Sequence, residues 1–193
     1  MDFRAVDPGA LTWSMGPRGL PAVRNTAGAK VIVQTPTCPC RVTVQAPGMY
    51  RMELQLMPGV ASHDAFAKWA SEVEDSAADA GALAGWKGGK RRSSWVFNGT
   101  ARLMAFSDTM AFDADGKLSA DLMDAQGCAA LIELQGLWST DAKWGVRWKV
   151  SQVKFSKEPP TLPCVSSGTD AAVSDDEAHA VPPDPSIFAF LDD

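Results

Sequence analysis

A strand whose buried side changes part-way along constrains the fold of this sequence more than any other feature. In the segment "KWGVRWKVSQVKF", apolar side chains first occupy every second position, as in a strand with one buried face: Trp144, Val146, Trp148 and Val150. After Ser151 the apolar positions shift to Val153 and Phe155. Such a shift indicates a β-bulge or strong coiling, as in a strand that turns a barrel corner. We therefore predict that Trp144 and Trp148 lie in the core, with Arg147 and Lys149 on the outside.

The rest of the sequence predicts several short strands and one helix. Strands are expected at residues 30–35, 41–45 (with Val42 and Val44 buried), 49–57, 117–122 and 129–138, with a hairpin turn at Asn98-Gly99. A helix is expected from Ser62 to near Gly81, because apolar residues recur there at helical spacing: Phe66, Trp69, Ala70, Val73 and Ala77. About six to eight strands with a single helix favour a small β-barrel or a sandwich, since a parallel α/β sheet would need a helix between successive strands.

The net charge of -5 is unevenly distributed along the 193 residues. All 18 basic residues precede residue 170, together with 16 of the 23 acids, so residues 1–169 carry a net charge of about +2. The seven remaining acids lie in a segment without Lys or Arg. We interpret residues 1–29 as an N-terminal extension, residues 30–157 as the folded domain and residues 158–193 as a disordered tail rich in Pro and acids.

Signatures of enzymes and metal sites are missing from the sequence. It has no phosphate-binding glycine motif, zinc-protease motif or nucleophile elbow, and its two histidines, His63 and His179, offer little for a Ser-His or Cys-His pair. The four cysteines include no C-x-x-C pair, and "FDADG" has the composition of a polar turn. We therefore predict no enzymatic activity, no metal and no cofactor. Because neither a membrane-spanning run nor a secretory signal is recognisable, an intracellular protein with reduced thiols is expected.

Two segments combine aromatic residues with cations. The first is "WKGGKRRSSWVF", and the second is the strand that contains Arg147 and Lys149. Proteins that bind single-stranded nucleic acid without sequence preference use cations along the phosphates and flat side chains on which bases stack. A tryptophan alone more often packs in a core, and a charge cluster alone more often forms a solvated surface. With Trp144 and Trp148 assigned to the core, Trp86 and Trp95 are the expected stacking residues.

Several segments between residues 30 and 157 resemble one protein family, in the family's order. They are "KVIVQTP", "MYRMELQL", "FAKWASEVEDSAADAG", "FDADGKL", "LIELQGLW" and "KWGVRWKVSQVKF". The chain thereby resembles the single-stranded DNA-binding proteins of nucleocytoplasmic large DNA viruses and their algal relatives, distant kin of a tailed-phage single-stranded DNA-binding protein with an acidic tail. The resemblance implies an OB-fold barrel with one helix, nonspecific binding of single-stranded DNA, and an acidic C-terminus that competes with DNA and docks replication partners.

Together these inferences define the expected sites and partners. DNA binding is predicted for Lys87, Lys90, Arg91, Arg92, Trp86, Trp95, Arg147 and Lys149, and partner docking for Asp175, Asp176, Glu177, Phe188, Phe190, Asp192 and Asp193. We expect action in replication or recombination, in the nucleus or at a viral replication site; a homodimer is left open. Two alternatives remain: a structural or scaffolding β-domain, for instance in a virion, and an RNA-binding OB module. Convergence of the glycine-rich basic segment with Arg147 and Lys149 on one concave face would favour DNA over the scaffold.

Overall fold

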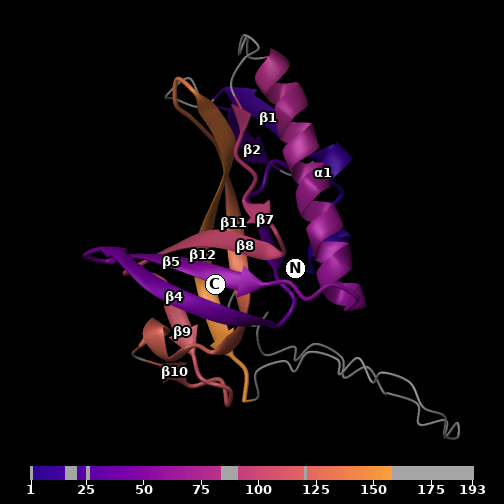
Figure 1. The fold of residues 1–193 in the computed structure, drawn as a ribbon. Helices are drawn as coiled ribbons and strands as arrows, with labels where there is room; N and C mark the ends of the chain where they lie inside the picture. The colour runs from indigo at the N-terminus through magenta and orange to yellow at the C-terminus, as the bar shows by residue number, and fades with distance from the viewer. Residues whose placement is uncertain (1, 16–20, 25–26, 84–90, 120, 158–193) are drawn as a thin grey trace, which may run out of the picture. The chain divides into compact units, whose positions relative to one another are not determined.

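The computed structural model describes residues 2–15, 21–24, 27–83, 91–119 and 121–157, all within a compact unit of residues 1–160 (Figure 1). The strands are β1 (Thr12–Met15), β2 (Pro21–Arg24), β3 (Val31–Gln34), β4 (Cys38–Ala46), β5 (Met49–Gln55), β6 (Arg91–Arg92), β7 (Val96–Phe97), β8 (Thr100–Phe106), β9 (Met110–Phe112), β10 (Leu118–Ser119), β11 (Gly127–Ser139) and β12 (Lys143–Phe155). The helices are α1 (Ala61–Leu83) and the 3-10 turns η1 (Phe3–Ala5), η2 (Pro8–Ala10) and η3 (Leu122–Asp124).

Five of these strands close into a ring. β4 pairs with β5, β5 with β8, β8 with β12, β12 with β11, and β11 again with β4. The β8–β12 contact is the parallel one, and the other four are antiparallel. This arrangement, with one α-helix, is that of an OB-fold-like barrel. The mainly β fold class predicted from the sequence is therefore confirmed.

The predicted change of phase in β12 corresponds to a β-bulge. Leu131 of β11 is opposite Gln152, but its neighbour Ile132 is opposite Val150, so Ser151 is the extra residue. Trp144, Val146, Trp148 and Val150 are all buried on the near side of the bulge, as predicted. Beyond it, Val153 is fully buried as well. The bulge lets one strand contribute to the core at both ends while it curves around the barrel.

Aromatic side chains join α1 to the barrel. The ring centroids of Trp69 on the helix and Trp148 on β12 are 5.7 Å apart, and those of Trp148 and Trp95 are 4.9 Å apart. Phe66 meets Trp95 edge-on at 5.7 Å. The predicted apolar face of the helix is confirmed, because each of its five residues is buried: Phe66, Trp69, Ala70, Val73 and Ala77. Contacts of this kind between aromatic rings add to the stability that burial provides.

The N-terminal segment shares this core. Phe3 is 5.1 Å from Phe66 between ring centroids, and Val6, Leu11 and Val23 are also buried. The indole N–H of Trp69 donates to the carbonyl oxygen of Val6 at 2.9 Å. Residues ahead of position 30 therefore cover the helix and complete its packing. The division of the chain at residues 29 and 157 stays a prediction.

Two local predictions have opposite outcomes. The hairpin turn between β7 and β8 is confirmed, because Asn98 and Gly99 both have positive φ, 50° and 69°, as a type I′ turn requires. The prediction that Val44 is buried was wrong, since this residue is 58% exposed. The register of β4 against β5 shifts between Val44 and Ala46, near the turn of the hairpin. Val44 thus lies beyond the part of the hairpin that covers the core.

None of the helices in the described parts of the chain is both long and apolar enough to cross a membrane.

Candidate nucleic-acid interface

The outer surface of the barrel gathers five cations from four strands. They are Arg41 on β4, Arg51 on β5, Arg102 on β8, and Arg147 and Lys149 on β12; we call them the basic face. Pairing between strands sets their positions. Arg41 is opposite Glu53, which is opposite Arg102, whereas Arg51 is opposite Met104, which is opposite Lys149. Neighbouring strands lie about 4.8 Å apart, so Arg51 and Lys149 are separated by about 10 Å along a continuous surface.

Acids neutralise only part of the basic face. The ammonium of Lys149 lies 2.5 Å from a carboxylate oxygen of Asp108. The guanidinium of Arg102 lies 3.8 Å from a carboxylate oxygen of Glu53. The ion pair with Lys149 lowers the pKa of the Asp108 carboxyl. Arg41, Arg51 and Arg147 are exposed, and they form no ion pair with any residue of the described chain. These three guanidinium groups are free to bind an anion such as phosphate.

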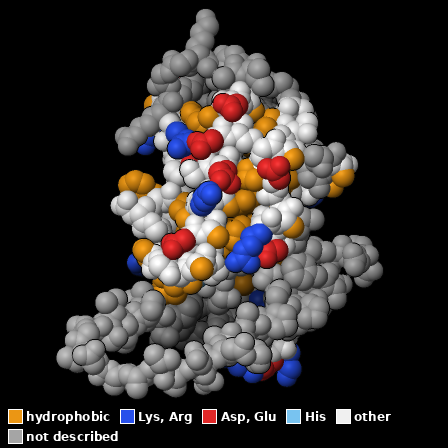
Figure 2. All heavy atoms as spheres, turned by 90° about the vertical axis from the view of Figure 1, so that its right-hand side faces the viewer, with side chains coloured by type: hydrophobic (Ala, Val, Ile, Leu, Met, Phe, Trp, Pro, Cys, Tyr) orange, Lys and Arg blue, Asp and Glu red, His pale blue; other side chains and the backbone are white. Residues whose placement is uncertain are grey.

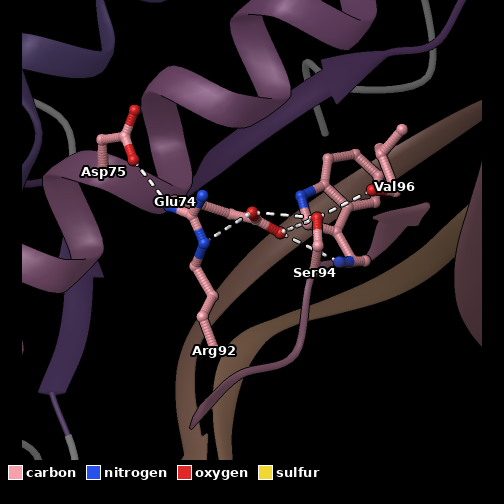
Figure 3. Close-up of polar contacts among 6 residues, drawn as sticks. Glu74, Asp75, Arg92, Ser94 and Val96 are labelled. Atoms are coloured by element: carbon pink, nitrogen blue, oxygen red, sulfur yellow. Dashed lines mark hydrogen bonds and ion pairs between the residues drawn. The ribbon is translucent and has the colours of Figure 1, made fainter. Parts of the chain in front are cut away.

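The end of the glycine-rich basic segment lies beside β12. Residues 91 and 92 pair in parallel with Lys143 and Trp144, at the start of that strand. The side chain of Arg92 is directed to α1, where its Nη1 lies 2.6 Å from Asp75 and its Nε 3.6 Å from Glu74 (Figure 3). Arg92 therefore meets helix carboxylates, apart from the basic face. Convergence of this segment with Arg147 and Lys149 would favour DNA binding; within the described residues, only the backbone pairing of residues 91 and 92 with the start of β12 brings the two together.

Glu74 fixes this segment to the helix. Its side chain is 3% exposed, and one carboxylate oxygen accepts the backbone N–H of Trp95 at 2.9 Å (Figure 3). The Ser94 hydroxyl lies 2.9 Å from both carboxylate oxygens. Burial raises the pKa of the Glu74 carboxyl, while the hydrogen bonds from Trp95 and Ser94 and the charge of Arg92 oppose that rise. The carboxylate thus satisfies a buried N–H group that would otherwise lack a partner.

Replacing Glu74 with glutamine is expected to remove a pH dependence of stability. Because the folded-state pKa of Glu74 lies above the ordinary value of 4.5, the folded protein binds a proton in the window between the two values that the unfolded chain does not. The contribution of Glu74 to the unfolding free energy therefore decreases as pH rises through this window. Denaturant unfolding at a series of pH values should show a flatter profile for Glu74→Gln, with the exposed Glu72→Gln as control. Equal profiles for the two variants would contradict this assignment.

The structure contradicts one predicted binding residue and offers three further candidates. Trp95 is 5% exposed and packs between Phe66 and Trp148, so its ring cannot receive a base. Several predicted residues lie outside the described part of the chain: Trp86, Lys87, Lys90 and all of the tail residues. The side chain of Arg91 is also outside it. Arg147 and Lys149 lie on the basic face. Sequence reasoning missed Arg41, Arg51 and Arg102, although each alternates with buried residues of its strand.

The described cysteines are free thiols, and His63 is held by hydrogen bonds to backbone groups. Cys38, Cys40 and Cys128 are free, and burial raises the pKa of the Cys38 thiol to about 12. His63 accepts the Met57 backbone N–H at Nδ1 at 2.9 Å, and its Nε2 lies 3.0 Å from the Thr37 carbonyl oxygen. Within the described ranges, no group of three or more His, Cys, Asp or Glu side chains could hold a metal ion.

The "FDADG" segment forms the predicted polar turn. The carboxylate of Asp113 accepts the backbone N–H groups of Asp115 and Lys117 at 3.0 and 2.9 Å. The Gly116 N–H donates to the Asp113 carbonyl oxygen at 3.0 Å, and Gly116 has a φ of 83°. These contacts stabilise a tight turn between β9 and β10.

The helix side of the molecule has a different charge pattern from the basic face. Exposed positions of α1 carry one cation among several acids: Lys68, Asp64, Glu72, Asp75 and Asp79. Figure 2, which shows the right-hand side of Figure 1, has acidic and basic side chains interspersed over this surface. A polyanion would meet repulsion from the helix acids here. The basic face is therefore the better candidate for binding nucleic acid.

Comparisons with known proteins found likeness among solved structures alone. No protein-family model and no curated protein matches the chain. The single-stranded DNA-binding protein encoded by bacteriophage T7 has a TM-score of 0.45 and 11% identity, with 72% of this chain and 98% of that chain covered. The single-stranded DNA-binding protein of bacteriophage Enc34 has a TM-score of 0.44 and 12% identity, covering 83% of this chain and 96% of that one. The C-terminal truncation of the Enc34 protein has a TM-score of 0.44 and 10% identity, with 78% of this chain and 96% of that chain covered. Likeness at this level assigns no function, and the viral and algal family stays a prediction.

Proposed function

We propose that this chain binds single-stranded DNA without sequence preference through the basic face of its barrel, and that it acts in DNA replication or recombination. The observation that carries the proposal is the grouping of Arg41, Arg51 and Arg147, exposed and without acidic partners in the described chain, on one barrel surface. The basic face as a whole includes β5 with Arg51 and β8 with Arg102, the second and third strands of the barrel ring along the chain. OB-folds bind oligonucleotides with the surface of these two strands.

The chemistry of the basic face suits a single strand. A guanidinium group binds phosphate oxygens through paired N–H donors and also stacks on the planes of bases. Both interactions are available with any base, because every nucleotide has a phosphate and a π-face. The partly exposed Thr43 and Met104 lie between the cations and offer uncharged surface for the bases. This combination favours binding without sequence preference.

A titration with labelled oligonucleotides tests the proposal. Fluorescence anisotropy with oligo(dT), duplex DNA and oligo(rU) at low salt should give the tightest binding for oligo(dT). The logarithm of the affinity should fall linearly with the logarithm of the salt concentration, by about 0.7 for each phosphate contact. Failure to bind oligo(dT) at low salt would overturn the proposal. Equal or tighter binding of oligo(rU) would instead support the RNA-binding alternative.

We also propose that the acidic C-terminal segment competes with DNA for the basic face and docks replication proteins. Removing residues 170–193 takes away seven acids and no cation, so the truncated chain is expected to bind oligo(dT) more tightly than the full chain at low salt. The same titration measures the difference, which should shrink as salt screens the charges. A full-length control in which the seven acids become Asn or Gln separates charge from length. Unchanged affinity in both variants would refute the competition.

A further inference from the structure

Trp138 lies on the outer surface of the β11–β12 hairpin. In the register of the two strands it is opposite Gly145, while the neighbouring pair, Ser139 and Trp144, faces the other side. A Cβ atom at residue 145 would lie 2.8 Å from the indole Nε1 of Trp138 and 2.9 Å from its Cε2. The carbonyl oxygen of Ser93 would lie 2.8 Å from the same Cβ, so the indole ring and this carbonyl together occupy the space that a side chain at position 145 would fill. The indole crosses β12 directly over the backbone of this glycine.

Other tryptophans of the described chain have different surroundings. Trp69, Trp95, Trp144 and Trp148 are at most 9% exposed and belong to the core. Trp13 is partly exposed, but it packs against the core, and its indole N–H donates to the Ser76 hydroxyl at 3.0 Å. Trp138 is partly exposed and is not among the residues that pack on the core. Burial in the core does not explain an indole at this position.

Two cations flank Trp138 on the same surface. Lys143 and Arg147 occupy the alternate positions of β12 on either side of Gly145, and both are exposed. Four residues of strand place their Cα atoms about 13 Å apart, with the indole between them. Neither forms an ion pair with another residue in the described parts of the chain. The flat ring thus lies between two cations that are free to bind phosphate groups.

We propose that Trp138 is a stacking platform for a base of the bound single strand, with Lys143 and Arg147 holding the phosphates on either side. This inference rests on the proposed binding of single-stranded DNA and specifies where a base is held. Gly145 contributes by leaving the indole room to lie across the strand. The platform extends the basic face along β12, from Lys149 and Arg147 to the start of the strand at Lys143.

The experiment compares Trp138→Leu and Trp138→Phe, two apolar variants of which one keeps an aromatic ring. Each is titrated with oligo(dT) and with an abasic oligomer of the same length, which keeps the phosphates but has no bases. Leucine at position 138 is expected to weaken oligo(dT) binding by about 5-fold or more, with phenylalanine losing less, because each stacked base contributes substantially to affinity. Affinity for the abasic oligomer should stay the same in both variants. Trp13→Leu is the matched control, since Trp13 is also partly exposed but its indole N–H donates to Ser76 on α1.

Each outcome separates the platform from the proposed function. If the unaltered chain does not bind oligo(dT), both proposals fall. If it binds and Trp138→Leu binds oligo(dT) equally well, the platform is refuted while the proposed function stands. Equal losses for oligo(dT) and the abasic oligomer also refute stacking, because the effect would then come from the phosphates or from a disturbed hairpin. Thermal unfolding of each variant shows whether the hairpin is intact.

Discussion

Replacing Arg41, Arg51 and Arg147 together with glutamate is expected to lower the affinity for single-stranded DNA by about 100-fold or more at low salt. Each substitution removes an exposed cation that has no acidic partner in the described chain and places a negative charge near the phosphates. The slope of affinity against salt, on logarithmic axes, should decrease in magnitude by about 2, because three phosphate contacts are lost. Anisotropy titrations of oligo(dT) over a range of salt concentrations measure both quantities.

A matched variant with the same change in net charge makes this result specific. Lys30, Lys68 and Lys157 are cations outside the basic face, and each lies within 4.0 Å of an acid: Glu133, Glu72 and Asp115. Replacing these three with glutamate should reduce affinity much less than the arginine triple does, because they do not lie on the surface that binds DNA. Equal losses in the two triples would mean that overall charge, and not the basic face, governs binding.

Replacing Trp148 with alanine is expected to reduce the free energy of unfolding by about 3–5 kcal/mol. The side chain is 3% exposed and contacts Trp69 on α1 and Trp95 ahead of β7. Its removal would leave a cavity where helix and barrel meet, and the surrounding rings could fill this only in part. A domain of this size commonly has a stability of about 5–15 kcal/mol, so the loss is a large share of the total.

Denaturant unfolding monitored by far-ultraviolet circular dichroism measures this effect. Phe97→Ala is the control, because Phe97 is also aromatic but 54% exposed, and its loss should change stability by about 0.5 kcal/mol or less. A Trp148→Ala variant as stable as the Phe97→Ala variant would show that the aromatic cluster does not hold the helix on the barrel.

The sequence predicted those parts of the fold that depend on local periodicity. The alternation from Trp144 to Val150 and its shift at Ser151 identified both the buried face of β12 and the bulge. The spacing of Phe66, Trp69 and Val73 identified the buried face of α1. These patterns are legible because one side of a long element meets a core along most of its length.

Other features depend on pairing between distant segments, which a local pattern does not contain. Arg51 and Lys149 come together because β5 pairs with β8 and β8 pairs with β12, a parallel contact that closes the ring. Trp95 was predicted as an exposed stacking residue because it follows a basic segment. β7 is two residues long, too short for alternation to indicate that Phe66 and Trp148 bury this ring. The buried residues ahead of position 30 were missed for a related reason, since their partners lie on the helix.

The anchoring of Ser94 and Trp95 by Glu74 has an evolutionary consequence. In the sequence, the segment of residues 84–90 lies between the helix, whose apolar face packs in the core, and a stretch that is held by pairing with β12 and by the helix carboxylates of Glu74 and Asp75. Selection can therefore act on its length and on its number of cations while both of its anchoring points stay the same. Relatives of this protein are expected to differ most in this segment, and to keep an acid at position 74 with a hydrogen-bond donor at the position of Ser94.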